Sequence, residues 1–356
     1  MKAAEETRLR LLAHYAAYPV VQVRDLFKYI FQSAFGCEHP LASKDGEYAA
    51  CILREYQALT VKTGASPEPL DGAYSRVPLS CISDGITPET LARLFCHSAK
   101  PEENGKAALL EKIEVARALV AEGALPFALG EFDRALDAWR DAGYPAVRHS
   151  EQFCDAYAPA YRVIANDYVR FLPLFAAIDR MLEQGGAIVA IEGGSAGGKT
   201  TVSALLADVY DCNIFHMDDF FLRPEQRTPT RLAEIGGNID RERFAREVVL
   251  PLTEQKTVVY RPFDCRKQTL AAPITALPKP LTVVEGAYSM HPAFSRYYDL
   301  SAFLDISPDV QRKRIEKRNT SALAERFFNE WIPMENAYLE KTDVRARADL
   351  IIPIGQ

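Results

Sequence analysis

The sequence has few of the features that mark membrane, secreted or nucleic-acid-binding proteins. Among its 356 residues, no apolar run approaches the roughly 18 residues of a transmembrane helix, so we expect no membrane contact. The seven cysteines are odd in number and include no Cys-x-x-Cys pair, which favours reduced thiols in a cytoplasmic protein. The net charge is −6 and neither half has an excess of basic residues, so we expect no broad surface for nucleic acid.

Metal-site spacing is also missing from the sequence. Cys37-Glu38-His39 and Cys96-His97 each place a thiol near an imidazole, but neither has the paired ligand spacing of a zinc site. The chain has no visible internal repeat or low-complexity tract. Hydrophobic residues make up 48% of it and charged residues 25%, as in an ordinary globular protein, and its length favours two domains.

The most specific feature of the chain is a glycine-rich stretch between an apolar run and a helix-forming run. The stretch reads Gly193, Gly194, Ser195, Ala196, Gly197, Gly198, Lys199, Thr200 and Thr201. It fits the pattern G-x-x-x-x-G-K-[ST] and lies between residues 187–191 and 202–206. Such a loop surrounds a phosphate with backbone N–H groups at a helix N-terminus, whereas the alternative is a plain glycine-rich turn. We expect Lys199 on the β- and γ-phosphates of ATP and the Thr200 hydroxyl on Mg²⁺.

The two halves of the chain differ in pattern. After Gly185, short Val- and Ile-rich runs alternate with helix-like runs, which predicts a doubly wound α/β fold with a mostly parallel sheet. Strands are expected at 187–192, 213–217, 257–260, 281–285, 302–306 and 349–354, with helices at 199–208, 241–250, 308–318 and 322–341. The first half predicts helices at 5–17, 23–35, 46–60, 88–97, 103–122, 131–141 and 150–182. We therefore expect a mostly helical domain over 1–183 and an α/β domain over 184–356, although the helix before that boundary fits either half.

Acidic residues follow two of the expected strands. Asp218 and Asp219 come after the run 213–217, and Glu285 ends the run 281–284. Because ligands bind at the carboxyl ends of parallel strands, we expect these carboxylates beside the glycine-rich loop. Asp218 is the candidate base for an attacking hydroxyl and a candidate Mg²⁺ ligand, with Asp219 as the runner-up beside the substrate. Glu285 is a second candidate Mg²⁺ ligand. The alternative for Asp218 is a helix cap or a solvated turn, and the alternative for Glu285 is an ion pair at a strand end.

Basic residues are concentrated on a predicted helix that begins after Ser307. Arg314 and Arg318 are four residues apart, so they share a face and could close over a triphosphate to stabilise the transferring group. A solvated helix face is the alternative. Loops between the strands carry weaker candidates for contacts to an acceptor substrate, namely Asp240, Tyr260, Arg261 and Arg266.

Together, these segments resemble the uridine kinase and phosphoribulokinase family of P-loop kinases, over about residues 188–319. The ordered motifs are Gly-Gly-Ser-Ala-Gly-Gly-Lys-Thr, Met-Asp-Asp-Phe-Phe, Asn-Ile-Asp, Tyr-Arg-Pro-Phe-Asp, Val-Val-Glu-Gly and the Arg-rich helix. The resemblance implies transfer of the ATP γ-phosphate to a hydroxyl of a small metabolite. It further implies Asp218 as base, Thr200 and Glu285 at Mg²⁺, Asp240 at ribose hydroxyls, Tyr260 in the nucleoside site, and Arg314 and Arg318 in a lid.

The sequence departs from this family in the loop after Tyr260, which lacks the histidine that contacts the base in uridine kinases. Nucleosides, sugar acids, sugar phosphates and pantothenate-like alcohols therefore all stay open as acceptors. The resemblance does not reach residues 1–180, which could shape the acceptor site, mediate a homodimer or carry a separate activity. A nucleotide-dependent switch, whose helical domain binds a partner, is the second hypothesis. The sequence has neither the N-K-x-D motif of GTPases nor the L-S-G-G-Q motif of ABC-type ATPases.

Overall fold

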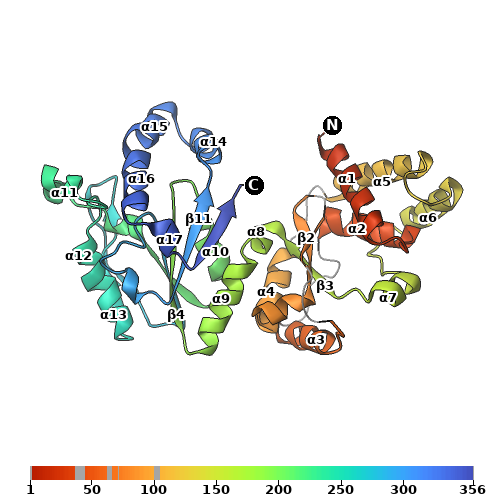
Figure 1. The fold of residues 1–356 in the computed structure, drawn as a ribbon, viewed down its shortest axis with the longest axis horizontal. Coiled ribbons are helices and arrows are strands. Elements are labelled where there is room, and N and C mark those ends of the chain that lie inside the picture. The colour runs from red at the N-terminus through yellow and green to blue at the C-terminus, as the bar shows by residue number, and fades with distance from the viewer. Residues whose placement is uncertain (1, 37–44, 62–65, 71, 100–104, 356) are drawn as a thin grey trace. The chain divides into compact units, whose positions relative to one another are not determined.

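The computed structural model describes residues 2–36, 45–61, 66–70, 72–99 and 105–355, so Cys37, Glu38 and His39 lie outside the described residues. The chain divides into two compact units, Met1–Leu172 and Pro173–Gln356 (Figure 1). The sequence analysis expected the boundary at 183/184. Helix α9 (Leu172–Glu183) instead lies almost wholly in the second unit, because it packs there. The Tyr210 hydroxyl donates to the carbonyl of Phe175 (3.3 Å) and to Asp179 (2.8 Å).

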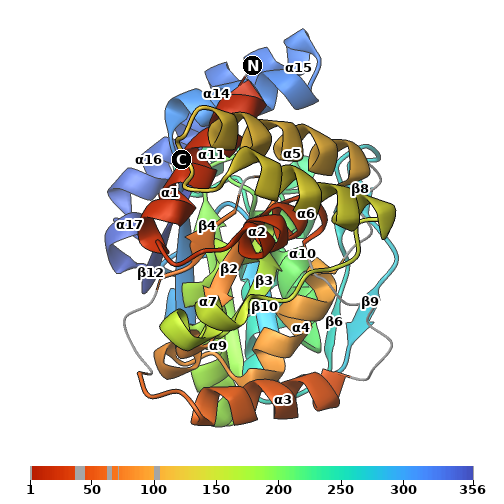
Figure 2. The same ribbon diagram turned by 90° about the vertical axis from the view of Figure 1, so that its right-hand side faces the viewer.

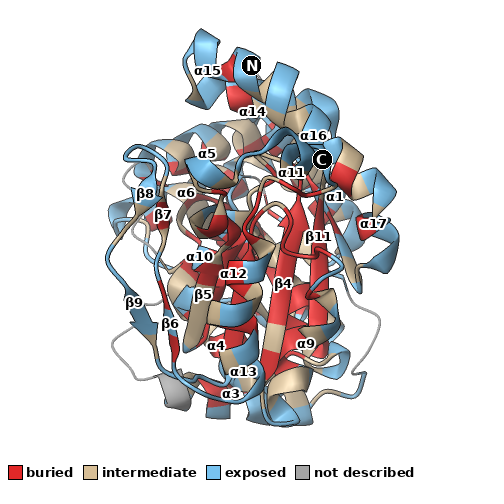
Figure 3. Ribbon diagram, turned by 90° about the vertical axis from the view of Figure 1, so that its left-hand side faces the viewer, coloured by how far each residue is buried: buried red, intermediate tan, exposed pale blue. Residues whose placement is uncertain are grey.

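The second unit is built on a five-stranded parallel sheet with the order β12-β11-β4-β10-β5. Its strands are β4 (Ala187–Gly193), β5 (Cys212–His216), β10 (Leu281–Glu285), β11 (Leu300–Ile306) and β12 (Leu350–Ile354). The first strand, β4, is central, so the chain crosses to one side of it for β10 and β5 and to the other for β11 and β12. Figure 3 shows β4 and β11 buried along most of their length. Burial on both faces explains their near-continuous apolar sequence and confirms the predicted α/β class.

One strand expected in this sheet pairs elsewhere. Residues 257–260 do form a strand, β6 (Val258–Tyr260), but it pairs antiparallel with β9 (Ile274–Ala276) in a separate ribbon. A second short ribbon joins β7 (Phe263–Asp264) to β8 (Thr269–Leu270). The prediction was wrong because a three-residue apolar run does not distinguish a core strand from a hairpin strand.

Helices pack along both sides of the parallel sheet (Figure 1). Besides α9, the α-helices are α10 (Lys199–Val209), α11 (Pro229–Ala233), α12 (Arg241–Phe244), α13 (Leu250–Thr253), α14 (Pro308–Arg318), α15 (Ser321–Arg326), α16 (Ile332–Lys341) and α17 (Val344–Arg347). Short 3-10 turns are η2 (Met217–Phe220), η3 (Pro224–Gln226) and η5 (Ser295–Tyr297), and π-helical turns are η4 (Ala245–Val249) and η6 (Phe327–Trp331). The predicted helices at 241–250 and 322–341 are therefore present, each interrupted by a π-helical turn.

The first unit combines helices with a three-stranded antiparallel sheet (Figures 1 and 2). Its helices are α1 (Lys2–Ala17), α2 (Val23–Phe35), α3 (Asp45–Gln57), α4 (Pro88–Ser98), α5 (Gly105–Ala121), α6 (Leu129–Asp141), α7 (Glu151–Tyr157) and α8 (Asn166–Val169), with a 3-10 helix η1 (Leu79–Asp84). The strands β1 (Glu68–Pro69), β2 (Tyr74–Pro78) and β3 (Tyr161–Ala165) pair in the order β1-β2-β3.

The single helix predicted over 150–182 is wrong. Helix α7 ends at Tyr157. The capping residue Ala158 has a left-handed φ of 41°, and Pro159 follows, which cannot continue a helix. The chain then extends into β3, since the Val163 and Ile164 side chains are buried in the unit.

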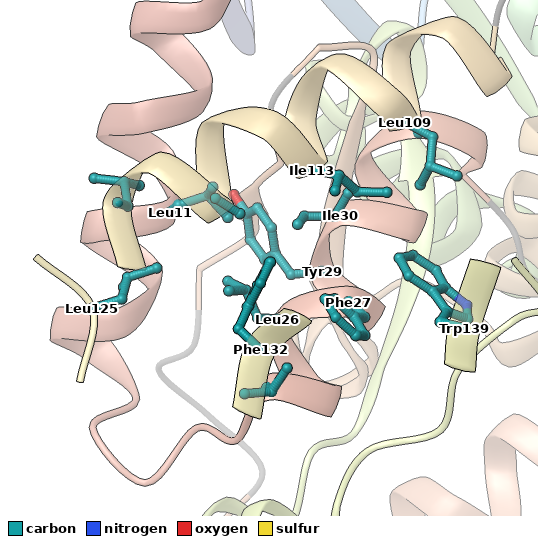
Figure 4. Packing of buried hydrophobic residues seen from close by; sticks show 14 of the residues in the cluster. Leu11, Leu26, Phe27, Tyr29, Ile30, Leu109, Ile113, Leu125, Phe132 and Trp139 are labelled. Carbon is teal, nitrogen blue, oxygen red and sulfur yellow. The ribbon is translucent and has the colours of Figure 1, made fainter. Parts of the chain in front are cut away.

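The core of the first unit lies between α1, α2, α5 and α6 (Figure 4). Phe27 stacks on Trp139 at 4.7 Å between ring centroids and meets Phe132 edge-on at 5.3 Å. The other labelled members are Leu11, Leu26, Tyr29, Ile30, Leu109, Ile113 and Leu125. In the described part of the chain, no helix combines the length and the apolar character that a bilayer crossing requires.

Candidate functional site

The glycine-rich loop joins the central strand β4 to α10, as the sequence predicts. Gly193 ends β4, where a Cβ atom would lie 2.7 Å from the carbonyl oxygen of Leu304 on β11, so only glycine fits. Gly198 has a φ of +94° and precedes Lys199, the first residue of α10. Because the chain crosses to opposite sides of β4, the loop lies at the topological switch point of the sheet, where α/β folds bind ligands.

Lys199 folds back over the loop that it follows. Its Nζ donates to the carbonyl oxygens of Gly193 (2.7 Å) and Gly194 (3.1 Å). The loop also closes on itself through a hydrogen bond from the Gly197 N–H to the Gly194 carbonyl (3.0 Å). The ammonium group is therefore held at the loop, within a short side-chain rotation of whatever the loop binds.

Glu285 and Thr200 meet at the carboxyl end of β10. The Thr200 hydroxyl donates to Oε1 of Glu285 at 3.0 Å, and the Glu285 side chain is buried. His216, at the end of β5, lies 2.6 Å from the same oxygen through Nδ1, and this hydrogen bond raises the pKa of His216. A hydroxyl and a carboxylate are the oxygen ligands that Mg²⁺ prefers, so these two residues fit the predicted metal role. No three His, Cys, Asp or Glu side chains group as a metal site among the described residues, but Mg²⁺ at a phosphate needs only one or two protein ligands.

Asp218 is the second residue of the turn η2, which directly follows β5. Its side chain keeps contact with solvent, yet protein groups surround the carboxyl, and this burial raises its pKa. The nearby charge of Lys199 opposes the rise, and the charges of Glu285 and Glu335 add to it. The structure therefore brings the predicted base together with the loop lysine and with the predicted Mg²⁺ ligand Glu285.

Asp219 is engaged differently from Asp218. Its Oδ2 accepts from the Tyr260 hydroxyl at 3.2 Å, and its backbone carbonyl accepts from Arg243 at 2.6 Å. The Tyr260 ring is buried and stacks on Phe220 at 5.4 Å. Asp219 and Tyr260 thus form one wall beside Asp218.

Glu335, on α16, is a functional candidate that the sequence analysis missed. Its Oε2 accepts from the Ser195 N–H at 2.8 Å and its Oε1 from the Ser195 hydroxyl at 2.6 Å. The Glu335 carboxylate thus accepts hydrogen bonds from the loop, as the oxygens of a bound phosphate would. Its negative charge also contributes to the raised pKa of Asp218. Glu335 and Ser195 are 140 positions apart, and a single Glu at such a distance forms no motif that sequence analysis could recognise.

Glu192 is a second carboxylate that the sequence analysis missed. It is completely buried next to the loop, and Oε1 accepts from the backbone N–H groups of Gly193 (3.1 Å) and Tyr288 (3.2 Å). Oε2 accepts from the Met290 N–H (3.1 Å) and from the Tyr338 hydroxyl on α16 (3.0 Å). Burial raises the pKa of Glu192 to about 7, although the charge of Lys199 and these donors act against the rise. Glu192 thereby ties α16 and the segment after β10 to the loop strand.

The Arg-rich helix α14 contacts the loop through one of its two predicted arginines. Arg314 Nη1 donates to the Ala196 carbonyl at 3.0 Å, and the neighbouring Gln311 amide donates to the Ser195 carbonyl at 2.9 Å. Arg318 instead packs over the Phe327 ring, 5.5 Å from its centre. Its lid role stays a prediction.

The remaining predicted acceptor contacts have structural partners in this conformation. Asp240 is buried at the N-terminus of α12, where Oδ1 accepts from the Arg243 N–H (3.1 Å) and Oδ2 from the Gln226 amide (2.8 Å). Arg261 donates to the carbonyls of Ala271 and Leu270, which braces the β7–β8 ribbon. Arg266 is exposed in the turn of that ribbon. Contacts of these residues to a substrate stay predictions.

A recess of about 400 Å³ adjoins the loop at Gly194, between β11, α14, η6 and α16. Gln311, Arg312, Phe328 and Asn336 are among its lining residues, whereas Lys199, Asp218 and Glu285 are not. We therefore do not assign the acceptor to this recess.

No protein-family model and no curated protein matches the chain. Among solved structures, it is similar to a protein described as a possible uridine kinase from Bacillus stearothermophilus, with 19% identity over 50% of this chain and 98% of that one and a TM-score of 0.38. A protein proposed to be a fructose transport system kinase, from Silicibacter sp. TM1040, is 24% identical over 47% and 89%, with a TM-score of 0.39. TT1252 from Thermus thermophilus is 21% identical over 48% and 90%, with a TM-score of 0.28. The first of these descriptions names the activity of the family that the motifs resemble, but at such identities and TM-scores the argument about activity depends on the site itself.

Proposed function

We propose that the second unit is an ATP- and Mg²⁺-dependent kinase that transfers the γ-phosphate to a hydroxyl group of a small, nucleoside-like or sugar-like metabolite. The observation that carries this proposal is the convergence of three features at the carboxyl ends of the adjacent strands β4, β10 and β5. The glycine-rich loop follows β4, Glu285 ends β10, and Asp218 follows β5. Phosphoryl transfer needs held phosphates, a metal site and a group that orients the nucleophile, and each strand supplies one of these.

The residues divide the work as follows. Backbone N–H groups of the loop and the Lys199 ammonium bind the phosphates, for which Lys199 leaves the carbonyls of Gly193 and Gly194. Thr200 and Glu285 would hold Mg²⁺, which neutralises phosphate charge. Asp218 accepts the proton of the acceptor hydroxyl. At the same time the hydroxyl oxygen bonds to the γ-phosphorus, and the bond between the γ-phosphorus and the bridging oxygen of the β-phosphate breaks. Arg314, already at the loop, adds positive charge.

The direct test is phosphoryl transfer by the full chain. We expect Mg-ATP and a panel of nucleosides, sugars and sugar acids to give a new phosphomonoester signal in ³¹P NMR, which Lys199→Ala abolishes. The exposed Lys256 makes Lys256→Ala a matched control that should keep full activity. Slow ATP hydrolysis without transfer to any acceptor would favour the regulatory ATPase instead.

The contact between Glu335 and the loop predicts a measurable effect on nucleotide binding. We expect Glu335→Gln to bind Mg-ATP roughly fivefold more tightly, because one negative charge near the phosphate site is worth about 1 kcal/mol. Isothermal titration calorimetry measures this. Glu330→Gln is the matched control, since Glu330 pairs with Arg326 on the exposed surface. Weaker binding by Glu335→Gln would show that Glu335 supports the nucleotide rather than competing with it.

A further inference from the structure

The first unit contains a cavity of mixed polar and aromatic lining that the proposed kinase chemistry does not use. Its volume is about 290 Å³, just below the roughly 300–1,000 Å³ range of small-molecule pockets. Its lining includes Glu68, Arg76 and Ser80 from β1, β2 and η1. Its aromatic residues come from α7, from β3 and, as Tyr18, from the position directly after α1.

Buried polar atoms without a partner are concentrated at this cavity. The described residues contain four such side-chain atoms, and two of them, Arg76 Nη2 and Ser80 Oγ, belong to lining residues. A third, His14 Nε2, lies just behind the wall, since the His14 ring packs 4.9 Å from that of the lining residue Tyr18. Buried polar groups are rarely left unpaired, because each then loses its hydrogen bonds to water without replacing them.

Arg76 is held rigidly, and one end of its buried guanidinium has no hydrogen-bond partner among the described residues. Only 2% of the residue is exposed to solvent. Nε donates to Gln32 at 2.8 Å and Nη1 to Glu68 at 3.2 Å, while the group lies 4.9 Å from the centre of the Tyr161 ring. These contacts fix the plane of the guanidinium, so Nη2 is a preorganised donor.

The charges around Arg76 are balanced. Burial acts to raise the pKa of Glu68, but the hydrogen bond from His14 and the charge of Arg76 outweigh it and lower the pKa. Burial lowers the pKa of His14, so the imidazole is neutral at pH 7. Arg76 and Glu68 therefore cancel, and the cavity can take either a neutral or a singly negative acceptor.

Three aromatic side chains of the lining pack against one another, with ring planes inclined by 46–78°. The ring centroids of Tyr18, Phe153 and Tyr157 lie 4.9–5.4 Å apart in each pair. All three line the cavity. Aromatic faces of this kind favour a flat ring over an aliphatic group of the same size.

We propose that this cavity is a second small-molecule site, which takes a planar ring carrying an sp² oxygen acceptor, either a ring carboxylate or a ring carbonyl. The oxygen accepts from Arg76 Nη2 and the Ser80 hydroxyl, and the ring packs on Tyr18, Phe153 and Tyr157. The site is independent of the phosphate loop, so this inference stands or falls separately from the kinase proposal.

Ligand-observed NMR on the full chain tests this site with benzoate, benzamide and cyclohexanecarboxylate as probes. We expect benzoate or benzamide to bind, and the better of the two reports whether the site prefers a charged or a neutral oxygen. Cyclohexanecarboxylate should bind at least tenfold more weakly because it lacks a flat face. Binding of none of the probes, or equal binding of the aliphatic one, would overturn the proposal and leave a cavity that holds only water.

Variants then assign the binding to these donors. Ser80→Ala should weaken binding of the flat probe about tenfold, which is the effect of one lost hydrogen bond. Ser83→Ala is the matched control, because Ser83 is in the same helix η1 with an exposed side chain. Arg76→Lys, which keeps the positive charge but loses the planar guanidinium group, should also weaken binding of the flat probe. Equal affinities of Ser80→Ala and Ser83→Ala would contradict the assignment, and Trp139 fluorescence checks that each variant is folded. Phosphoryl transfer should be unchanged in Ser80→Ala.

Discussion

Replacing Asp218 with Asn should reduce the rate of phosphoryl transfer by roughly 10²–10⁴, the usual contribution of a positioned general base. Asn keeps the size and the hydrogen-bonding oxygen of Asp218 but cannot accept a proton. Mg-ATP binding should survive, because the loop donors and Lys199 are untouched. Single-turnover kinetics with the acceptor found in the ³¹P screen separates the transfer step from binding.

Asp219→Asn is the matched variant for this experiment. Asp219 is the neighbouring carboxylate, but it already accepts from Tyr260, so we expect a loss of less than tenfold. If Asp219→Asn abolished transfer while Asp218→Asn kept it, the base would be Asp219, the runner-up of the sequence analysis. Robust transfer by both variants would remove the base role from this turn.

The second large effect concerns the stability of the first unit. Asp25 is fully buried on α2, where Oδ1 accepts from the Ser150 N–H (2.8 Å) and Oδ2 from the Ser150 hydroxyl (2.6 Å) and the Gln22 N–H (3.0 Å). His149 Nδ1 lies 3.0 Å from Oδ1. We expect Asp25→Ala to destabilise this unit by about 3 kcal/mol or more, because two backbone N–H groups lose their acceptor.

The two tryptophans let each unit be followed alone, since Trp139 lies in the first and Trp331 in the second. Urea unfolding in a Trp331→Phe background reports the first unit. Asp141→Ala is the control, because the Asp141 side chain is 78% exposed. A shift of the unfolding midpoint no larger than that of the control would show that Asp25 is not a structural anchor.

The same residue predicts how stability depends on pH. Burial alone would raise the pKa of Asp25, but the hydrogen bonds from His149, Ser150 and Gln22 prevail and lower it from 3.8 to about 2. The folded state therefore binds this proton less readily than the unfolded state, so the stabilisation is complete above pH 3.8 and is lost as pH falls towards 2. The difference corresponds to about 2 kcal/mol. The pH dependence in this range should disappear in Asp25→Ala.

Local motifs predicted much of the second unit from sequence. The loop, its strand and its helix were assigned correctly because a glycine with positive φ, a lysine and a hydroxyl must occupy adjacent positions whatever surrounds them. The helix predicted at 308–318 coincides with α14 because Ser307 caps it and Pro308 occupies its first turn. Strand β6 and the wrongly predicted helix over 150–182 show where prediction from local sequence fails. The structure of such segments depends on partners that are distant along the chain.

The sequence by itself determined that this chain carries an α/β unit with a glycine-rich loop after its first strand and acidic residues at strand ends, because those signals depend on residues close together along the chain. Only the tertiary structure decided that Glu335 lies on the loop, that Glu192 ties α16 to it, and that Arg76 and Ser80 share a cavity with Tyr18 and with aromatic residues of α7. Those contacts join positions up to 146 residues apart. The free energy that selects such partners comes from burial and charge pairing in the folded unit, which no local pattern encodes.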